Sequence, residues 1–299
     1  MASIVVLTHE RDRFRSRGYT LESFFAPWTA AGHDVRVHEG PHRPPPGDLA
    51  ILHVDTTVVA EAYLEAARHY PIVVNGTVTD ISKRRFSQQV VDRGSAYAGP
   101  VIVKTDLNCF GRPEAFHRSL RARWSALRLG PVRAFAQRVR HAAGRDPRYR
   151  IYGHPSEVPA AVWGDPRLVV EQFLPEHDER GYYLRTWMFL GDRGRCTRVL
   201  GPHPVVKGSD AIERVPVPVP DEVRTWRQQL GFDYGKFDFV IHDGRPVLFD
   251  VNPTPGLFVA FSAAVRAANA DLARGIETWL QAAPARARRT SVGQRSPSS

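Results

Sequence analysis

The stretch that decides the fold lies near the end of the chain and reads, from Gly231 to Gly256, GFDYGKFDFVIHDGRPVLFDVNPTPG. Two runs rich in β-forming residues, Phe237–Ile241 and Pro246–Val251, flank Asp243-Gly244. An Asp-Gly pair between two such runs is a strong short-range signal for a β-hairpin. The sequence therefore predicts two antiparallel strands here, and the rest of the chain can be read relative to them.

Three side chains with oxygen donors, Asp238, Asp250 and Asn252, lie on or just after these strands. Side chains alternate between the two faces of a strand, so the connecting turn decides whether these three share a face. A three-residue turn over His242–Gly244, with its glycine left-handed, keeps them together. It places Asp238 opposite Leu248 and diagonal to Asp250, whereas a two-residue turn would separate the two acids.

Two carboxylates and a carboxamide aimed at one point suit Mg²⁺, a hard cation that prefers oxygen ligands and often shares them with nucleotide phosphates. The simpler alternative is a hairpin with solvated acids. Asp250, however, stands between Phe249 and Val251 in an apolar strand. Because a lone buried carboxylate is costly, a bound cation is a natural partner for it.

The run DFV…GRPVLFDVNPTPG resembles the C-terminal metal-binding signature of the ATP-grasp superfamily, especially its carboxylate–amine ligases of the glutathione-synthetase and ribosomal-protein-modifying type. Those enzymes usually carry Asp, Glu and Asn at the three metal positions. The resemblance implies that Asp238, Asp250 and Asn252 hold Mg²⁺, with a shorter acid at the middle position. It also implies ATP as cofactor.

Composition and charge limit the other possibilities. The chain has 299 residues and two cysteines, Cys109 and Cys196, without CxxC spacing. A disulfide framework is therefore not expected, and a cytoplasmic location fits best. The N-terminal apolar run is too short for a signal peptide, and no apolar run approaches the length of a membrane span. The formal net charge of +10 is compatible with nucleic acid, an acidic surface or an anionic substrate.

The first 79 residues alternate between strand and helix patterns, which predicts a small, mostly parallel α/β unit. Neither a GxGxxG motif after the first strand nor a P-loop motif occurs in the sequence, so dinucleotide and P-loop binding are not indicated. The expected strands and helices are, in order, Ile4–Leu7, Leu21–Ala31, Asp34–His38, Leu49–Val54, Ala60–Tyr70 and Ile72–Val74.

Two lysines are candidates for binding phosphates. Lys104 ends the apolar run Pro100–Val103, where an amine is unexpected unless it meets an anion. Lys83 lies in the segment Asp80–Phe86, which is expected to open a helix. It resembles the first of the two lysines that contact nucleotide phosphates in ATP-grasp proteins. A surface lysine is the alternative, and a strong one for Lys83. The family's glycine-rich loop is replaced by DLNCFGRPE, in which Gly111 and neighbouring amides are candidates for phosphate binding.

The segment Leu168–Glu176 is an apolar strand that breaks at a proline. It resembles the adenine-binding hinge of ATP-grasp enzymes. The resemblance places Glu171 by the adenine amine, assigns backbone contacts to Phe173 and Leu174, and makes Glu176 a ribose ligand, with Asp178 or Glu179 as alternatives. The nucleotide-binding residues that it implies in this segment are Glu171, Gln172, Phe173, Leu174 and Glu176.

Two basic residues follow as catalytic candidates. Arg185 is the single charge within the long strand Gly181–Leu190, between Tyr183 and Trp187 on one face, so it can stack or hold an anion. By resemblance it contacts the transferred phosphate or an acyl phosphate. Lys207 is a second candidate for the γ-phosphate, with a surface-loop lysine as the alternative.

Residues 112–150 contain eleven arginines and only two acids. Apolar residues recur there at helical spacing, which predicts a basic helical insertion of two amphipathic helices. A solvated face, an anionic-substrate platform and a nucleic-acid footprint are all compatible with it. No RNA- or DNA-binding motif accompanies the charge, so we expect no nucleic-acid partner. The basic, low-complexity tail 284–299 is expected to be disordered.

The predicted fold class is α/β, becoming α+β in the second part. An N-terminal parallel α/β domain (1–79) precedes an ATP-grasp domain (80–283). The expected function is an ATP- and Mg²⁺-dependent ligase that forms an amide through an acyl phosphate. Its partners would be a small-molecule or peptide carboxylate and an amine acceptor, possibly anionic. The alternatives are a kinase for a small-molecule or sugar hydroxyl, and a non-catalytic basic module. The sequence leaves the oligomeric state open.

Overall fold

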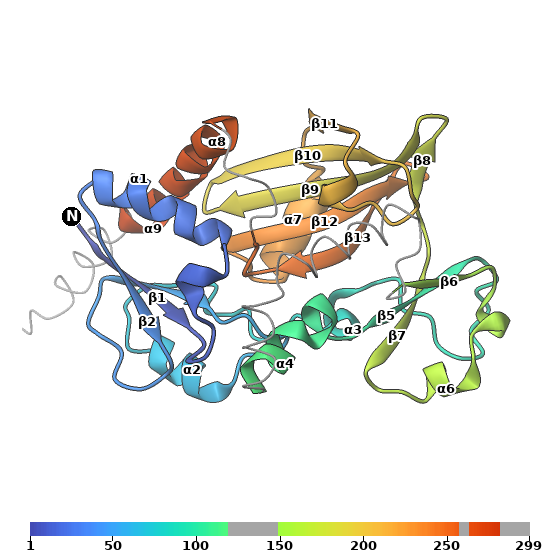
Figure 1. The fold of residues 1–299 in the computed structure, drawn as a ribbon, viewed down its shortest axis with the longest axis horizontal. Helices are drawn as coiled ribbons and strands as arrows, with labels where there is room; N and C mark the ends of the chain where they lie inside the picture. The colour runs from blue at the N-terminus through green and yellow to red at the C-terminus, as the bar shows by residue number, and fades with distance from the viewer. Residues whose placement is uncertain (119–148, 257–262, 282–299) are drawn as a thin grey trace, which may run out of the picture.

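The computed structural model of the chain describes residues 1–118, 149–256 and 263–281. In these residues the strands form a four-stranded, a six-stranded and a three-stranded sheet. Figure 1 shows the four-stranded sheet at one end of the molecule and the other two sheets at the opposite end, with the three-stranded sheet lying below the six-stranded one. This mixed architecture confirms the predicted α/β fold class with an α+β second part.

The N-terminal sheet is parallel throughout, as the alternation of strand and helix patterns predicts. Its two central strands are almost entirely buried, which explains their unbroken apolar sequences, because helices cover both faces of such a sheet. In spatial order the strands are β2 (Asp34–Glu39), β1 (Ser3–Thr8), β3 (Leu49–His53) and β4 (Val73–Val74).

The two remaining sheets are antiparallel. The three-stranded sheet has the order β6-β5-β7, and the large sheet has the order β11-β10-β9-β12-β13, with β8 pairing with β9. The strands are β5 (Val101–Thr105), β6 (Arg150–Tyr152), β7 (Leu168–Gln172), β8 (Glu176–Asp178), β9 (Gly181–Leu190), β10 (Arg193–Gly201), β11 (Glu213–Pro216), β12 (Tyr234–His242) and β13 (Arg245–Asn252).

The helices are mostly short. The α-helices are α1 (Phe25–Ala30), α2 (Glu61–Ala67), α3 (Lys83–Phe86), α4 (Arg112–Arg118), α6 (Ala160–Trp163), α7 (Asp221–Gln229), α8 (Ala263–Ala273) and α9 (Glu277–Leu280). The 3₁₀ helices are η1 (Phe14–Ser16), η2 (Thr20–Phe24), η3 (Asn108–Gly111), η4 (Pro155–Glu157), η5 (Gly208–Asp210) and η6 (Arg274–Ile276).

The turn of the β12–β13 hairpin differs from the prediction. His242 pairs directly with Arg245, so the turn contains two residues, Asp243 and Gly244, instead of three. Both have positive φ, 48° and 78°, as in the type I′ turn that Asp-Gly favours. The predicted three-residue turn is therefore wrong.

A β-bulge in β13 returns Asp250 to the face of the hairpin that carries Asp238, although the turn has only two residues. Phe239 pairs with Leu248 and Asp238 pairs with Asp250, so Phe249 is an extra residue on β13. One extra residue shifts the later side chains of that strand to the other face. The two acids consequently lie directly opposite each other on the same face of the hairpin, where the prediction had placed Leu248 opposite Asp238.

One hydrophobic cluster joins the N-terminal unit to the large sheet. It contains Ile4 and Val6 from β1 together with Leu190 from β9 and Tyr234 from β12. Trp28 in α1 donates from its indole nitrogen to the carbonyl oxygen of Ala273 in α8 at 2.7 Å. The core therefore continues across residue 79, the predicted boundary between the two domains.

Two predicted segments lie mainly outside the described residues. Of the basic helical insertion 112–150, the structure describes α4 and the residues from 149 onward. The tail 284–299 lies wholly outside the described ranges. No helix in the described residues combines the length and the apolarity that crossing a bilayer requires.

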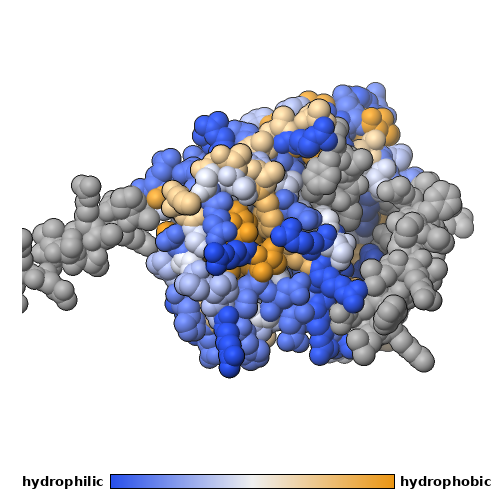
Figure 2. Space-filling view, turned by 60° about the vertical axis from the view of Figure 1, so that its left-hand side comes forward, coloured by the Kyte–Doolittle hydropathy of each residue, from blue (hydrophilic) through white to orange (hydrophobic). Residues whose placement is uncertain are grey.

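The surface in Figure 2 is mainly hydrophilic, with a hydrophobic patch near its centre bordered by strongly hydrophilic residues. Most large apolar side chains are instead buried; among the described residues, only Met1, Val58, Ile151 and Ile212 are large hydrophobic residues with high exposure. The apolar sequence runs are thus accounted for by the core.

His53 at the end of β3 gives a pH-dependent prediction. It is fully buried, and burial lowers its pKa to about 4, although Asp12 acts in the opposite direction. The unfolded chain therefore binds a proton between about pH 6.5 and 4 that the folded chain does not, and stability falls as the pH decreases through this window. Between pH 8 and pH 5 we expect His53 to contribute a loss of about 2 kcal/mol in unfolding free energy.

Urea unfolding of wild type and His53→Leu at several pH values measures this effect. The unfolding free energy of His53→Leu should decrease less steeply between pH 6.5 and 4 than that of the wild type. His69→Gln is the control, because His69 is exposed just after α2, and its unfolding free energy should follow the wild-type curve. Identical pH profiles for all three proteins would contradict the assignment of a neutral buried imidazole.

Candidate active site

The three predicted metal ligands gather on one face of the β12–β13 hairpin. Asp238 pairs with Asp250, and Lys236 pairs with Asn252 two residues away along each strand. On the neighbouring strand β9, the hydroxyl of Thr186 donates to Asp238 Oδ1 at 3.0 Å. Because paired residues project to the same side of a sheet, this face carries two carboxylates, a carboxamide and an amine.

Lys236 is a site residue that the sequence reasoning missed. Its Nζ lies 2.6 Å from Asp238 Oδ2, and its side chain is 23% exposed. Burial opposes the charge of this amine, but the carboxylates of Asp238 and Asp250 outweigh burial and raise the pKa of Lys236. The signal was available, since Lys236 stands two residues before Asp238 and so shares its face.

The two predicted phosphate-binding lysines are buried beside the same hairpin. Lys83 Nζ lies 3.7 Å from Asp250 Oδ1, with its side chain 9% exposed. Lys104 Nζ pairs with Glu171 Oε2 at 2.5 Å and lies 5.0 Å from the ring centroid of Phe249, the bulge residue. Neither lysine therefore occupies the exposed position that the surface alternative requires.

The predicted adenine hinge leaves specific groups available. The amide of Gln172 donates to the carbonyl of Gln89 and that of Phe173 to the carbonyl of Pro100, each at 2.8 Å. Among the described residues, the amide of Leu174 has no such partner, and neither does the buried Glu171 Oε1. A backbone donor and a buried acceptor therefore lie near the end of β7.

The loop after Lys104 is strained where the prediction places phosphate contacts. Cys109, Phe110 and Gly111 have φ of 47°, 63° and 66°, a left-handed conformation that costs roughly 1–2 kcal/mol for each residue with a side chain. Such strain is concentrated at functional sites. Lys207 lies beside this turn, with Nζ 4.4 Å from the ring centroid of Tyr149 and 5.9 Å from that of Phe110.

The side chain of Arg185 does not lie on the face of the sheet that carries Asp238 and Asp250. Arg185 pairs with Phe239 on β12, whereas its neighbour Thr186 pairs with Asp238, so its side chain projects from the opposite face of the sheet. Its Nε and Nη2 bind both oxygens of Glu176 at 2.9 and 2.7 Å. The amide of Ile241 also donates to Glu176 Oε2 at 2.7 Å. The predicted catalytic arginine and the predicted ribose ligand thus bind each other.

The two alternative ribose ligands also lie at β8 and the following turn. Asp178 accepts hydrogen bonds from the hydroxyl of Tyr183 at 2.7 Å and from the amide of Arg180 at 2.8 Å. The Tyr183 hydroxyl, more than any other group, lowers the pKa of the Asp178 carboxyl. Glu179 is exposed in the turn between β8 and β9. The assignment among Glu176, Asp178 and Glu179 stays a prediction.

The donor set at the hairpin suits a hard cation. Asp238, Asp250 and Asn252 each offer a side-chain oxygen, the kind of ligand that Mg²⁺ prefers. Across the described residues, no three His, Cys, Asp or Glu side chains are gathered as a metal site, and Asn252 offers a third side-chain oxygen on the face of the two acids. The residues present therefore fit the predicted ion.

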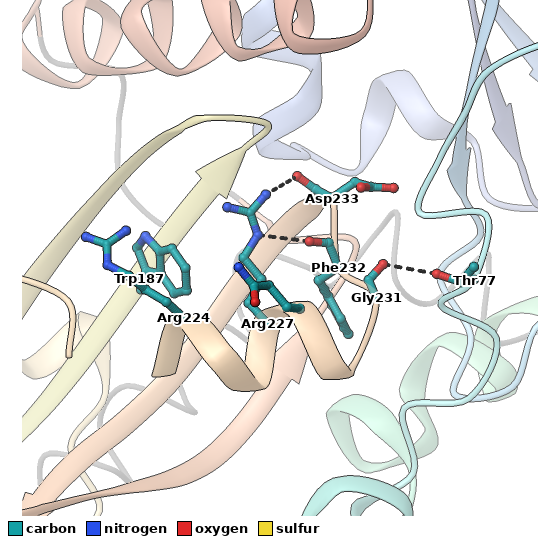
Figure 3. Close-up of a pocket in the computed structure, with 8 residues that line it drawn as sticks. Thr77, Trp187, Arg224, Arg227, Gly231, Phe232 and Asp233 are labelled. Carbon is teal, nitrogen blue, oxygen red and sulfur yellow. Dashed lines mark hydrogen bonds between the residues drawn. The ribbon is translucent and has the colours of Figure 1, made fainter. Parts of the chain in front are cut away.

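A cavity of 610 Å³ lies elsewhere, on the α7 side of the large sheet. Figure 3 shows Arg227 pointing across it, with hydrogen bonds to Phe232 and Asp233. A third bond joins the Arg227 guanidinium to the carbonyl of Gly191 at 2.8 Å. These carbonyls already satisfy much of the guanidinium, so it braces the loop before β12, and none of the predicted site residues lines the cavity.

Comparison with known proteins yields similar structures only. No protein-family model matches the sequence, and no curated protein matches it. D-alanine–D-alanine ligase from Bacillus anthracis, complexed with ATP, is similar with a TM-score of 0.52 and 13% identity over 94% of this chain and 98% of that chain. The RimK domain protein ATP-grasp from Sphaerobacter thermophilus DSM 20745 has a TM-score of 0.50 and 14% identity, over 92% and 99% of the two chains.

The buried pair of Lys104 and Glu171 gives a stability prediction. Removing one partner leaves the other charge buried without compensation, so Lys104→Met should lower the unfolding free energy by about 3 kcal/mol. The double variant Lys104→Met/Glu171→Gln should recover part of this loss. Chemical denaturation measures both.

The matched control is Arg167→Gln, which breaks the exposed ion pair between Arg167 and Asp165. Exposed ion pairs contribute little to the free energy of unfolding, so the denaturation midpoint of this variant should equal that of the wild type. A Lys104→Met variant as stable as the control would show that the buried pair is absent in solution.

Proposed function

The chain has the ATP-grasp fold, and we propose that it is an ATP- and Mg²⁺-dependent ligase that joins a carboxylate to an amine. The observation that carries this proposal is the pairing of Asp238 with Asp250 across the hairpin, beside Asn252 and Lys236. A face that combines two carboxylates, a carboxamide and an amine can bind charged ligands of both signs. The ATP complex of the structurally similar D-alanine–D-alanine ligase supports a nucleotide in this role.

In this proposal, different residues bind the metal ion, the phosphates and the adenine of the nucleotide. Asp238, Asp250 and Asn252 hold Mg²⁺, which neutralises phosphate charge when bound. Lys83 and Lys104 bind phosphate oxygens, as do the amides around Gly111 and the amine of Lys207. The segment from Glu171 to Leu174, at and just after the end of β7, binds the adenine. Lys236 is added as a further phosphate contact, because its amine shares the face of the carboxylates.

The proposed reaction has two steps. A substrate carboxylate oxygen forms a bond to the γ-phosphorus of ATP while the bond to ADP breaks. The amine nitrogen then attacks the acyl carbon, phosphate leaves, and the nitrogen loses a proton to give the amide. The protein's contribution is positioning and charge neutralisation by lysines, which phosphoryl transfer mainly requires.

Asp250→Asn tests the metal role. The substitution keeps the shape of the side chain but removes one negative charge from the cation site, so we expect ADP formation to fall at least about a hundredfold. ADP release is measured with Mg²⁺ and ATP over amino acids, short peptides and sugar acids, singly and in pairs. A ligase requires two co-substrates before ADP appears, whereas a hydroxyl kinase requires one.

Asp243→Asn is the matched control, since it makes the same charge change in the exposed turn of the same hairpin. It should release ADP at the wild-type rate. Undiminished turnover in Asp250→Asn would falsify the metal assignment, and ADP release with a single hydroxyl substrate would replace the ligase by a kinase.

A further inference from the structure

Asp55, just after β3 in the N-terminal unit, lies where three distant segments meet. Its carboxylate is only 7% exposed. Oδ2 accepts a hydrogen bond from Arg17 Nη2 at 3.0 Å. The Tyr19 hydroxyl, which has one proton, lies 3.0 Å from this oxygen and 2.9 Å from Asp12 Oδ1. Asp55 Oδ1 accepts from the hydroxyl of Thr254 at 2.9 Å and from Asn108 Nδ2 at 3.4 Å. Both oxygens of Asp55 therefore accept hydrogen bonds, and two of the partner residues, Asn108 and Thr254, come from outside the N-terminal unit.

Thr254 connects Asp55 to the proposed cation ligand Asn252. The amide of Thr254 donates to Asn252 Oδ1 at 2.8 Å. The Thr254 hydroxyl has one proton and two acceptors within reach, Asp55 Oδ1 at 2.9 Å and Asn252 Oδ1 at 3.2 Å. The closer acceptor, Asp55 Oδ1, makes the shorter and therefore stronger hydrogen bond. Asp55 thus accepts the hydrogen bond of the Thr254 hydroxyl and holds Thr254 in place, and the amide of Thr254 in turn orients the Asn252 carboxamide.

Asn108 connects the same carboxylate to the strained turn after β5. Its side chain reaches Asp55, and its backbone amide donates to the hydroxyl of Thr57 at 2.8 Å. The left-handed residues Cys109 and Phe110 follow immediately. Thr57 in turn donates to Glu114 Oε1 at 2.6 Å. The start of the turn is therefore held by hydrogen bonds to Asp55 and its neighbour Thr57.

We propose that Asp55 is a positioning residue, which aligns the Asn252 ligand through Thr254 and the proposed phosphate-binding turn through Asn108. This inference rests on the proposed function, because it takes Asn252 as a cation ligand. Residues that orient a metal ligand typically change metal affinity 10- to 100-fold when they are substituted. A purely structural brace between two units would instead lower stability and leave the affinity of the folded protein for the cation unchanged.

Four variants of the full-length chain distinguish these roles. Thr254→Val removes the hydroxyl but keeps the shape of the side chain, Thr254→Ser keeps the hydroxyl, and Asp55→Asn removes the charge. Thr225→Val is the matched control, since its hydroxyl donates to a carbonyl within α7. The measurement is Mn²⁺ affinity at saturating ADP, by electron paramagnetic resonance of free Mn²⁺, with thermal unfolding recorded in parallel.

We expect Thr254→Val and Asp55→Asn each to weaken Mn²⁺ binding about tenfold. Thr254→Ser and Thr225→Val should stay within about twofold of wild type. Asp55 and Thr254 act on Asn252 through one hydrogen bond. The double variant Asp55→Asn/Thr254→Val should therefore bind Mn²⁺ only slightly more weakly than the single variant that has the lower Mn²⁺ affinity. This non-additivity and the rescue by serine are outcomes that a general loss of stability does not produce.

Wild-type Mn²⁺ affinity in Thr254→Val would overturn the inference, even if Asp55→Asn fails to fold. It would leave the proposed function intact, provided that the wild-type protein binds Mn²⁺ in the presence of ADP. Failure of the wild-type protein itself to bind Mn²⁺ with ADP would defeat both the proposed function and the positioning role.

Discussion

The β-bulge at Phe249 is the constraint on which the candidate site depends. A two-residue turn joins β12 to β13, and with regular pairing it would send Asp238 and Asp250 to opposite faces. The extra residue restores a common face and leaves the two acids directly opposite each other. It also places the ring of Phe249 beside the amine of Lys104. Bulges of this kind occur beside active sites, where they redirect side chains. The geometry of the proposed cation site thus follows from one inserted residue.

Charge balance accounts for the cluster of ionisable groups around the hairpin. Buried charges require partners. Here three amines lie beside three carboxylates, of which Asp250 is partly exposed: Lys83, Lys104, Lys236, Asp238, Asp250 and Glu171. Each lysine is paired with one of the acids. Under the proposed function, a polyanionic nucleotide and a divalent cation would add charges of both signs beside these existing pairs. The site is therefore suited to a ligand that carries both.

The N-terminal unit is part of the structural support of this site. It shares a hydrophobic core with β9, β12 and the C-terminal helices, and Asn75 binds the backbone of Tyr234 through its side chain. Asp55 extends this connection to the end of β13 through Thr254. A displacement of the N-terminal sheet would consequently disturb the hairpin that carries the carboxylates. This dependence gives a physical reason why the fold combines the two units around one site.

The sequence by itself determined the strands, the hairpin and most of the residues that surround it. Alternation and apolar runs are local properties, so the parallel N-terminal sheet, β5, β7 and β9 were predicted close to their observed bounds. An amine in an apolar strand also indicated that Lys104 has a partner of opposite charge, and that partner is Glu171. Tertiary structure decided what depends on neighbours in space. The bulge at Phe249 and the pairing of Arg185 with Glu176 arise from contacts between strands that the local pattern does not contain. Strand parity could have identified Lys236, but only its 2.6 Å contact with Asp238 shows how its charge is balanced in the fold.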